Sequence, residues 1–65
     1  MKVLINNQTK EVKAATVQEL HAELGLPQKG VAIAIANKMV PRAEWESTSL
    51  QENDNIVVIK AAFGG

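Results

Sequence analysis

The residues best suited to chemistry stand at the end of the chain, in Phe63-Gly64-Gly65. Glycine has no Cβ, so a Gly-Gly backbone can thread a narrow channel and present the Gly65 carboxylate deep inside another protein's site. A carboxylate is a poor electrophile until ATP converts it to an acyl-adenylate, which sulfur or nitrogen nucleophiles can attack. We therefore predict that residues 61–65 form a flexible substrate tail, with Gly65 as the modified residue and Gly64 and Phe63 as threading residues.

The side chains offer no comparable set for catalysis. The chain has one histidine and no cysteine, which excludes disulfides and cysteine-based zinc sites. We expect His21 to be an ordinary helix-surface or boundary residue, since no Ser/His/Asp set accompanies it. Glu19 and Glu23 lie four residues apart, and we expect a solvated helix face there. The expectation is therefore a protein that is not an enzyme and holds neither metal nor cofactor.

Composition narrows the class of protein further. The chain has 65 residues, with seven Lys plus Arg against seven Asp plus Glu, and a formal net charge of zero. This balance argues against a nucleic-acid binder, which usually carries a basic face. No apolar run approaches the ~20 residues that span a bilayer, and no signal-peptide pattern opens the chain. We expect one small cytoplasmic domain that binds no nucleic acid and no membrane and is a monomer when free.

Alternating apolar and polar residues predict most of the strands. Strands are expected over residues 1–6, 9–13, 31–36, 39–40 and 56–59. Asparagines at 6–7 tolerate the positive φ of a tight hairpin turn, and a second turn is expected at Asn37-Lys38. In the third strand the β-branched Val31, Ile33 and Ile35 should face the core.

One helix is predicted over residues 17–24. Thr16 and Glu19 fit a capping box, in which each side chain would accept from the other residue's amide. Gly25 can adopt the left-handed conformation that ends a helix, and Pro27 blocks its continuation.

A short helical turn is expected over Pro41-Arg42-Ala43-Glu44-Trp45, because proline suits the first helical position. Tryptophan and arginine are enriched at binding hot spots. A single tryptophan in a small domain more often closes one end of the core, so we favour that structural role for Trp45. For Arg42 the structural and partner-binding interpretations stay equally open.

These elements predict an α+β domain over residues 1–60, in which one main helix and a short helical turn pack on a mixed sheet of about five strands. The order, with strands at both ends and a central helix, is that of the β-grasp, or ubiquitin-like, fold.

The last predicted strand, residues 56–59, is apolar on both faces, whereas one helix covers only one face of a sheet. Val57 and Ile59 would therefore lie on the open face, together with Leu4. Such an apolar patch usually marks a docking surface. The alternative is a flatter fold in which residues 41–50 cover that face.

With these motifs in place, the chain resembles the ThiS family of sulfur-carrier proteins. The resemblance rests on Thr16-Val17-x-Glu19-Leu20, Val31-Ala32-Ile33-Ala34-Ile35-Ala36-Asn37, Val40-Pro41-Arg42-x-x-Trp45 and Gly64-Gly65. It implies that a ThiF-like adenylyltransferase adenylates Gly65 with ATP and magnesium. Sulfur from cysteine, supplied through a desulfurase, would then make a thiocarboxylate for a ThiG-like thiazole synthase of thiamine biosynthesis.

Three other functions stay open. A MoaD-like carrier for molybdopterin synthesis uses the same chemistry, although its members usually run longer. A ubiquitin-like modifier would join Gly65 to a lysine, and a non-covalent interaction domain would carry its Gly-Gly incidentally. The chain also departs from the ThiS family pattern at Phe63, where a small or aliphatic residue is common.

Overall fold

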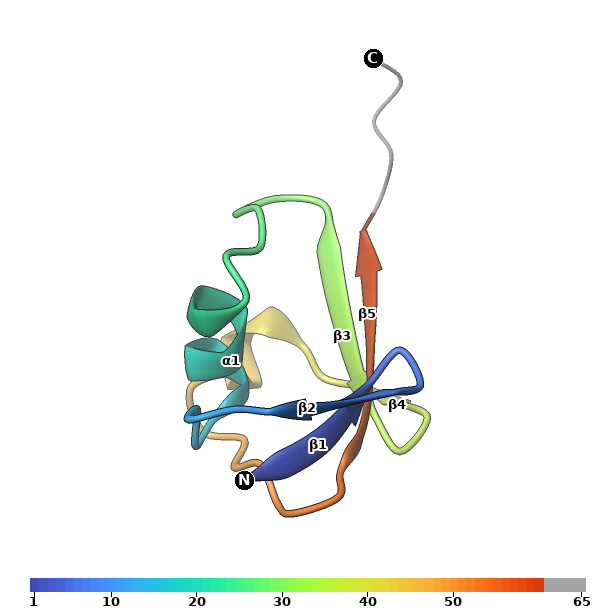
Figure 1. Cartoon of the computed structure of the whole chain (residues 1–65). Helices are drawn as coiled ribbons and strands as arrows, with labels where there is room; N and C mark the ends of the chain where they lie inside the picture. Colours follow the sequence, from blue (N-terminus) through green and yellow to red (C-terminus); the bar gives the residue numbers. More distant parts are fainter. Residues whose placement is uncertain (61–65) are drawn as a thin grey trace.

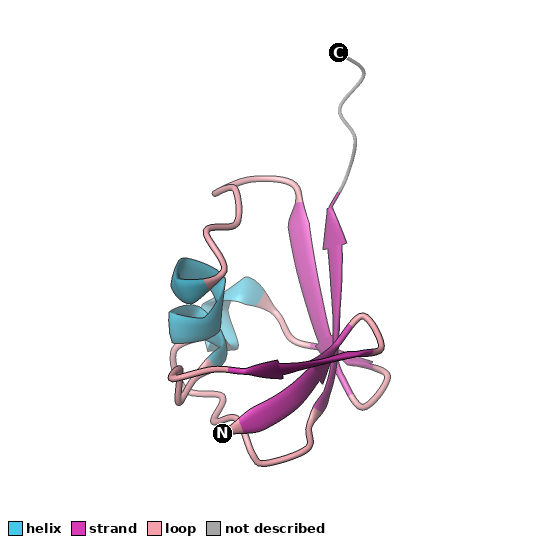
Figure 2. Cartoon of the chain, viewed as in Figure 1, coloured by secondary structure: helices cyan, strands magenta, loops and turns pink. Residues whose placement is uncertain are grey.

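The structure, a computed structural model, describes residues 1–60 (Figure 1). This part of the chain forms five strands, one α-helix and one 3-10 helix (Figure 2). They are β1 (Lys2–Ile5), β2 (Gln8–Glu11), α1 (Val17–Glu23), β3 (Val31–Ile35), β4 (Lys38–Met39), the 3-10 helix η1 (Arg42–Glu44) and β5 (Asn55–Lys60). The predicted order of elements is confirmed.

The strands form one mixed sheet in the order β2-β1-β5-β3-β4. β1 and β5 run parallel, and the other neighbouring pairs are antiparallel. The first and last strands therefore meet near the centre of the sheet, while α1 and η1 lie together on one of its sides (Figure 1). This arrangement is the β-grasp fold.

Two-residue turns set the register of both hairpins. Asn6 and Asn7 have φ values of 51° and 68°, and Ala36 and Asn37 have 52° and 67°. A two-residue turn with two successive positive φ values has a backbone twist that matches the right-handed twist of the strands it joins. The predicted turn at Asn37-Lys38 is wrong by one residue, because Ala36 adopts the left-handed conformation. As a result the fourth strand is β4, one residue earlier than predicted.

Helix α1 begins where the capping signal predicts. Thr16 Oγ1 accepts from the Glu19 amide at 3.2 Å. The predicted return bond to the Thr16 amide is wrong, since Glu19 Oε1 accepts from the Ala15 amide at 2.7 Å. Thr16 itself forms a β-bridge with Ser49, which ties the start of the helix to a later loop. The helix ends at Glu23, and Gly25 has the expected positive φ of 65°.

The hydrophobic core lies between the sheet and the helical layer. Its fully buried side chains are Val3, Val17, Leu20, Ile33, Trp45 and Ile56. Ile33 is buried, and Val31 and Ile35, which are half-buried at the two ends of β3, also pack against the core, as predicted. None of the helices in residues 1–60 has the length and apolar character needed to cross a bilayer.

Trp45 closes the core, as the sequence predicts. It is 1% exposed, and its Nε1 donates to the Val40 carbonyl at 3.0 Å. Trp45 and Leu50 both belong to the core cluster that contains α1. Residues 41–50 therefore pack on the helical side, and the alternative in which they cover the other face is wrong.

The prediction for His21 as a surface or boundary residue is wrong, because the side chain is only 4% exposed. Its Nε2 donates to the Pro27 carbonyl at 2.8 Å, and its ring centroid lies 5.1 Å from that of Trp45. The loop after α1 folds back over the histidine and supplies the acceptor. His21 is thus part of the packed interior, with a structural contact for its ring.

Candidate functional site

The strand that leads to the predicted tail presents different side chains to its two faces. In β5, Ile56 and Val58 are buried, Val57 is half-buried and Ile59 is 49% exposed. This alternation places Val57 and Ile59 on the sheet face opposite α1, as the sequence predicts. Lys60, the last residue of β5, is also the last described residue, and residues 61–65 follow it in the sequence.

The neighbouring strands extend this apolar face. Ala34 of β3 lies opposite Val57, and Ala32 lies opposite Ile59. Across the last hairpin Ala34 is paired with Met39, whose side chain is 59% exposed. Leu4 of β1 is half-buried and alternates with the buried Val3 and Ile5. We call this surface the open-face patch: Leu4, Ala32, Met39, Val57 and Ile59, together with Ala34, which is buried between its neighbours at 6% exposure.

Sequence reasoning missed Met39 as a member of the open-face patch. The omission follows from the turn, because a strand over residues 39–40 has a different register from β4. With the turn at Ala36-Asn37, Ile35 pairs with Lys38 and Ala34 with Met39. A turn assigned to Ala36-Asn37 in the sequence would have placed Met39 beside Ala34.

The role of Arg42 stayed open in the sequence analysis, and the structure shows that its side chain makes contacts within the fold. Its Nη1 donates to the Gln28 carbonyl and its Nη2 to Gln28 Oε1 at 3.3 Å. The guanidinium carbon also lies 4.8 Å from the centroid of the Trp45 ring. Arg42 therefore ties η1 to the loop that precedes β3.

Glu19 and Glu23 are both exposed, as predicted for a solvated helix face, and each also accepts hydrogen bonds from backbone amides. Glu23 accepts from the Lys13 amide at 3.0 and 3.1 Å and from the Ala14 amide at 2.9 Å. Glu19 accepts from the neighbouring Ala15 amide. Both carboxylates thus hold the segment before α1. Within residues 1–60 no group of three or more His, Cys, Asp or Glu side chains could hold a metal ion.

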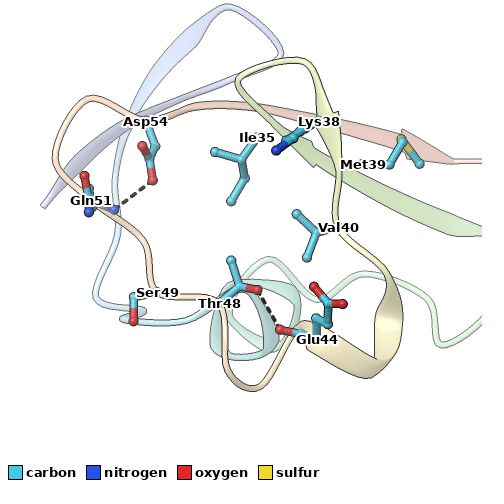
Figure 3. A pocket seen from close by; sticks show the side chains of 9 residues that line it. All are labelled: Ile35, Lys38, Met39, Val40, Glu44, Thr48, Ser49, Gln51 and Asp54. Carbon is cyan, nitrogen blue, oxygen red and sulfur yellow. Dashed lines mark hydrogen bonds between the residues drawn. The ribbon is translucent and has the colours of Figure 1, made fainter.

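A hollow of about 360 Å³ lies between the β3-β4 hairpin and the loop before β5 (Figure 3). The polar side chains of Thr48 and Asp54, which line the hollow, make hydrogen bonds within the loops that form it. Thr48 Oγ1 donates to the Glu44 carbonyl at 2.7 Å, and Asp54 Oδ2 accepts from the Gln51 amide at 2.8 Å. Of the open-face patch only Met39 lines the hollow, so the two features meet at this one residue.

The predicted modified residue, Gly65, and its neighbours Gly64 and Phe63 lie outside the described residues. Their assigned roles stay predictions. The structure describes the strand that leads to them and the open-face patch beside it.

Comparison with known proteins identifies the family. The sequence profile of the ThiS family matches residues 3–65. This chain belongs to the ThiS family. It is 36% identical over 66 residues to the sulfur carrier protein ThiS of Escherichia coli (strain K12), and the match covers 100% of both chains.

Two solved structures of a thiamine biosynthesis protein (ThiS) from Geobacter metallireducens share the fold of this ThiS-family chain. The crystal structure has a TM-score of 0.83 and 22% identity, with 100% of both chains covered. The solution NMR structure has the same TM-score and identity, and covers 100% of this chain and 88% of that one. The predicted resemblance to the ThiS family and the predicted fold are both confirmed.

Proposed function

We propose that this ThiS-family chain is a sulfur carrier for thiazole formation in thiamine biosynthesis, a co-substrate that is not itself the catalyst. The observation that carries the proposal is the family match, which runs from residue 3 through Gly64 and Gly65. The E. coli relative that matches along its whole length is named a sulfur carrier. Gly65 would be the modified residue, and Gly64 and Phe63 would thread into the partner.

The proposed chemistry takes place at the Gly65 carboxylate. A carboxylate oxygen attacks the α-phosphorus of ATP, so that an acyl-adenylate forms and pyrophosphate leaves. A sulfur nucleophile at the oxidation level of sulfide then attacks the carbonyl carbon. The new C–S bond forms as the bond from carbon to the AMP oxygen breaks, leaving a thiocarboxylate and AMP. Every reactive side chain in this sequence of steps belongs to a partner.

The partners that we propose are a ThiF-like adenylyltransferase and a ThiG-like thiazole synthase, with sulfur supplied through a cysteine desulfurase. The open-face patch would be the docking surface, with Val57, Ile59 and Leu4 as its contacts and Met39 as a further one. Two large apolar side chains, Met39 and Ile59, are exposed on it. Exposed apolar patches of this kind mark interaction sites. Because the reaction needs ATP and reduced sulfur, we place it in the cytoplasm, with the free carrier as a monomer.

Intact-mass spectrometry tests the proposal directly. The chain would be produced together with the ThiF-like adenylyltransferase and the desulfurase of its own organism. A mass increase equal to exchange of one oxygen for sulfur, located at Gly65 by fragmentation, is the expected result. An unchanged mass would contradict it, and lysine conjugates alone would favour a protein modifier.

A transfer assay separates the two sulfur-carrier pathways. The thiocarboxylate form is expected to lose its sulfur to the ThiG-like synthase when the other thiazole precursors are present. Transfer to a molybdopterin synthase and not to the ThiG-like enzyme would instead favour the MoaD-like alternative.

A further inference from the structure

The zero net charge of this chain conceals an uneven distribution of cations. Three of its seven basic residues, Lys29, Arg42 and Lys60, lie at the end of the sheet where β5 finishes and β3 begins. All three are exposed. We call these three residues the basic rim.

Pairing and hydrogen bonds bring the basic rim together from three parts of the sequence. Lys60 at the end of β5 lies opposite Val31 at the start of β3. Lys29 stands two residues before Val31, and Arg42 is bonded to Gln28 beside it. The three cations therefore border one continuous stretch, residues 28–31.

Residues 24–43 and 55–60, which include all three cations, contain no Asp or Glu. Three carboxylates flank these ranges. Glu44 lies two residues after Arg42 in η1 without forming an ion pair with it, and the other two accept hydrogen bonds from backbone amides. Glu23 accepts from the Lys13 and Ala14 amides, and Asp54 accepts from the Gln51 amide. Across residues 1–60 the one ion pair joins Met1 to Glu11, so no member of the basic rim is paired within that range.

The basic rim also stands at the place that any acceptor of the tail must approach. Lys60 directly precedes residues 61–65. A five-residue extended segment reaches at most about 18 Å, so a protein whose reaction centre holds Gly65 must bring the mouth of its channel close to Lys60. Charges at such a mouth would act on the rim over about a Debye length, ~8 Å at physiological salt.

We propose that the basic rim docks on an acidic protein surface around the channel by which the ThiF-like adenylyltransferase takes up the tail. This inference rests on the proposed function and adds the charge of the partner's surface to it. Complementary charge at the entrance steers encounter and sets the orientation in which the tail arrives. In this arrangement the open-face patch makes apolar contact with the partner, and the basic rim guides the encounter of the two proteins electrostatically.

The test compares two double variants with the same change in net charge. Lys29→Glu with Lys60→Glu reverses the rim, whereas Lys10→Glu with Lys38→Glu makes the same change on exposed residues of β2 and β4. Arg42 is left in place because it also ties η1 to the loop before β3. Thermal unfolding of both variants verifies that each still folds, which is expected because exposed substitutions seldom alter stability by more than about 0.5 kcal/mol.

The readout is kcat/KM for Gly65 adenylation, followed by ATP–pyrophosphate exchange with the ThiF-like enzyme. At about 0.05 M salt we expect the rim variant to lose about tenfold or more, and at about 0.5 M salt the loss should disappear. The control variant should stay within about twofold of the unaltered protein. Equal values for the two variants, or a loss that persists at high salt, would overturn the inference.

The same assay separates this inference from the proposed function on which it rests. If the unaltered chain is not adenylated, both are overturned. If it is adenylated and the rim variant is adenylated equally well at low salt, only the rim inference fails. Fluorescence anisotropy with a single-stranded oligonucleotide at about 0.15 M salt tests the other class of anionic partner. Tight binding there, lost in the rim variant while adenylation is unchanged, would assign the rim to nucleic acid and overturn the proposal.

Discussion

The side-chain amide of Asn6 pairs with both backbone groups of Val58, as a neighbouring strand would. Asn6 Oδ1 accepts from the Val58 amide at 2.9 Å, and Nδ2 donates to the Val58 carbonyl at 3.3 Å. The Asn6 amide also donates to the Ile56 carbonyl at 2.9 Å. Because the chain turns away from β5 after β1, this side chain extends the parallel pairing along β5 toward Lys60.

Replacing Asn6 with glycine isolates the contribution of this amide. Its φ of 51° suits glycine, so the turn is kept while both bonds to Val58 are lost. We expect a loss of about 1–2 kcal/mol in the free energy of unfolding, measured with denaturant, and faster hydrogen exchange at Val58. Asn7→Gly is the control, since Asn7 has a φ of 68° in the same turn. Equal effects of the two substitutions would assign the change to the turn.

Truncation of Trp45 tests its role in the core. Trp45→Ala should lower the free energy of unfolding by about 3–5 kcal/mol, because it leaves a cavity between Val40 and the ring of His21. Met39→Ala removes an apolar side chain that is 59% exposed, and should change stability by about 0.5 kcal/mol or less. Circular dichroism can follow both variants. A small effect at Trp45 would contradict its assignment as the residue that closes the core.

The Met1 ammonium and Glu11 lie 2.8 Å apart and predict a dependence of stability on pH. The hydrogen bond from Met1 holds the pKa of Glu11 below its model-compound value of 4.5. The stabilisation that ionised Glu11 gives the folded state is therefore present above pH 4.5 and is lost as pH falls through the folded-state pKa. The hydrogen bond to Glu11 raises the pKa of the Met1 ammonium above 8.0. The stabilisation that the charged ammonium gives the folded state is therefore present below pH 8 and is lost as pH rises through the folded-state pKa.

Glu11→Gln should weaken the dependence of stability on pH at both the acidic and the alkaline end, which we call the two limbs of the pH profile. Stability is measured as the denaturant midpoint at each pH. The change should be small because both groups are exposed to solvent. Glu46→Gln removes the same charge from another exposed site and should leave both limbs in place. A Glu11→Gln profile that keeps the slopes of the unaltered protein would show that this ion pair is not their source.

The open-face patch can be tested without altering charge. Ile59→Thr keeps β-branching and replaces apolar surface with a hydroxyl, so we expect KM for adenylation to rise about tenfold while the unfolding midpoint changes little. Gln8→Thr introduces the same residue on the exposed edge strand β2 and should leave KM unchanged. An unaltered KM for Ile59→Thr would exclude this residue from the docking surface.

Deletion of Gly65 should abolish sulfur loading and leave the unfolding midpoint unchanged, because the proposed reaction occurs at its carboxylate. Mass spectrometry and thermal unfolding measure the two outcomes on one preparation. Phe63→Leu, which introduces an aliphatic residue common in the family, should keep both loading and stability. Unfolding on deletion of Gly65 would instead give the tail a structural role.

The sequence predicts those parts of the fold that depend on local chemistry. Thr16 caps α1 and Gly25 ends it, because a hydroxyl acceptor and a residue without Cβ are what those positions require. Alternation in β5 likewise places Val57 and Ile59 on the face opposite the helix. Each of these features follows from residues within a few positions of one another.

The features that the sequence does not predict depend on contacts across the fold. His21 is buried because the Pro27 carbonyl and the Trp45 ring reach it from other segments. Glu23 accepts from the amides of Lys13 and Ala14, which lie ten and nine residues earlier in the chain. Alanine rarely adopts a positive φ, so nothing local identifies the turn at Ala36, and the position of Met39 depends on that turn.

The parallel pairing at the centre of the sheet has a consequence for synthesis. Asn6 and Val58, which extend that pairing, are 52 positions apart, and β5 is translated after the other four described strands. Until β5 is made, the β1-β2 and β3-β4 hairpins have no strand between them and the core lacks Ile56. Contacts of such long sequence separation form late, and exposed chains are open to proteases. We therefore expect prematurely terminated chains to stay unfolded and be degraded, so that they do not compete with complete carriers for the same enzymes.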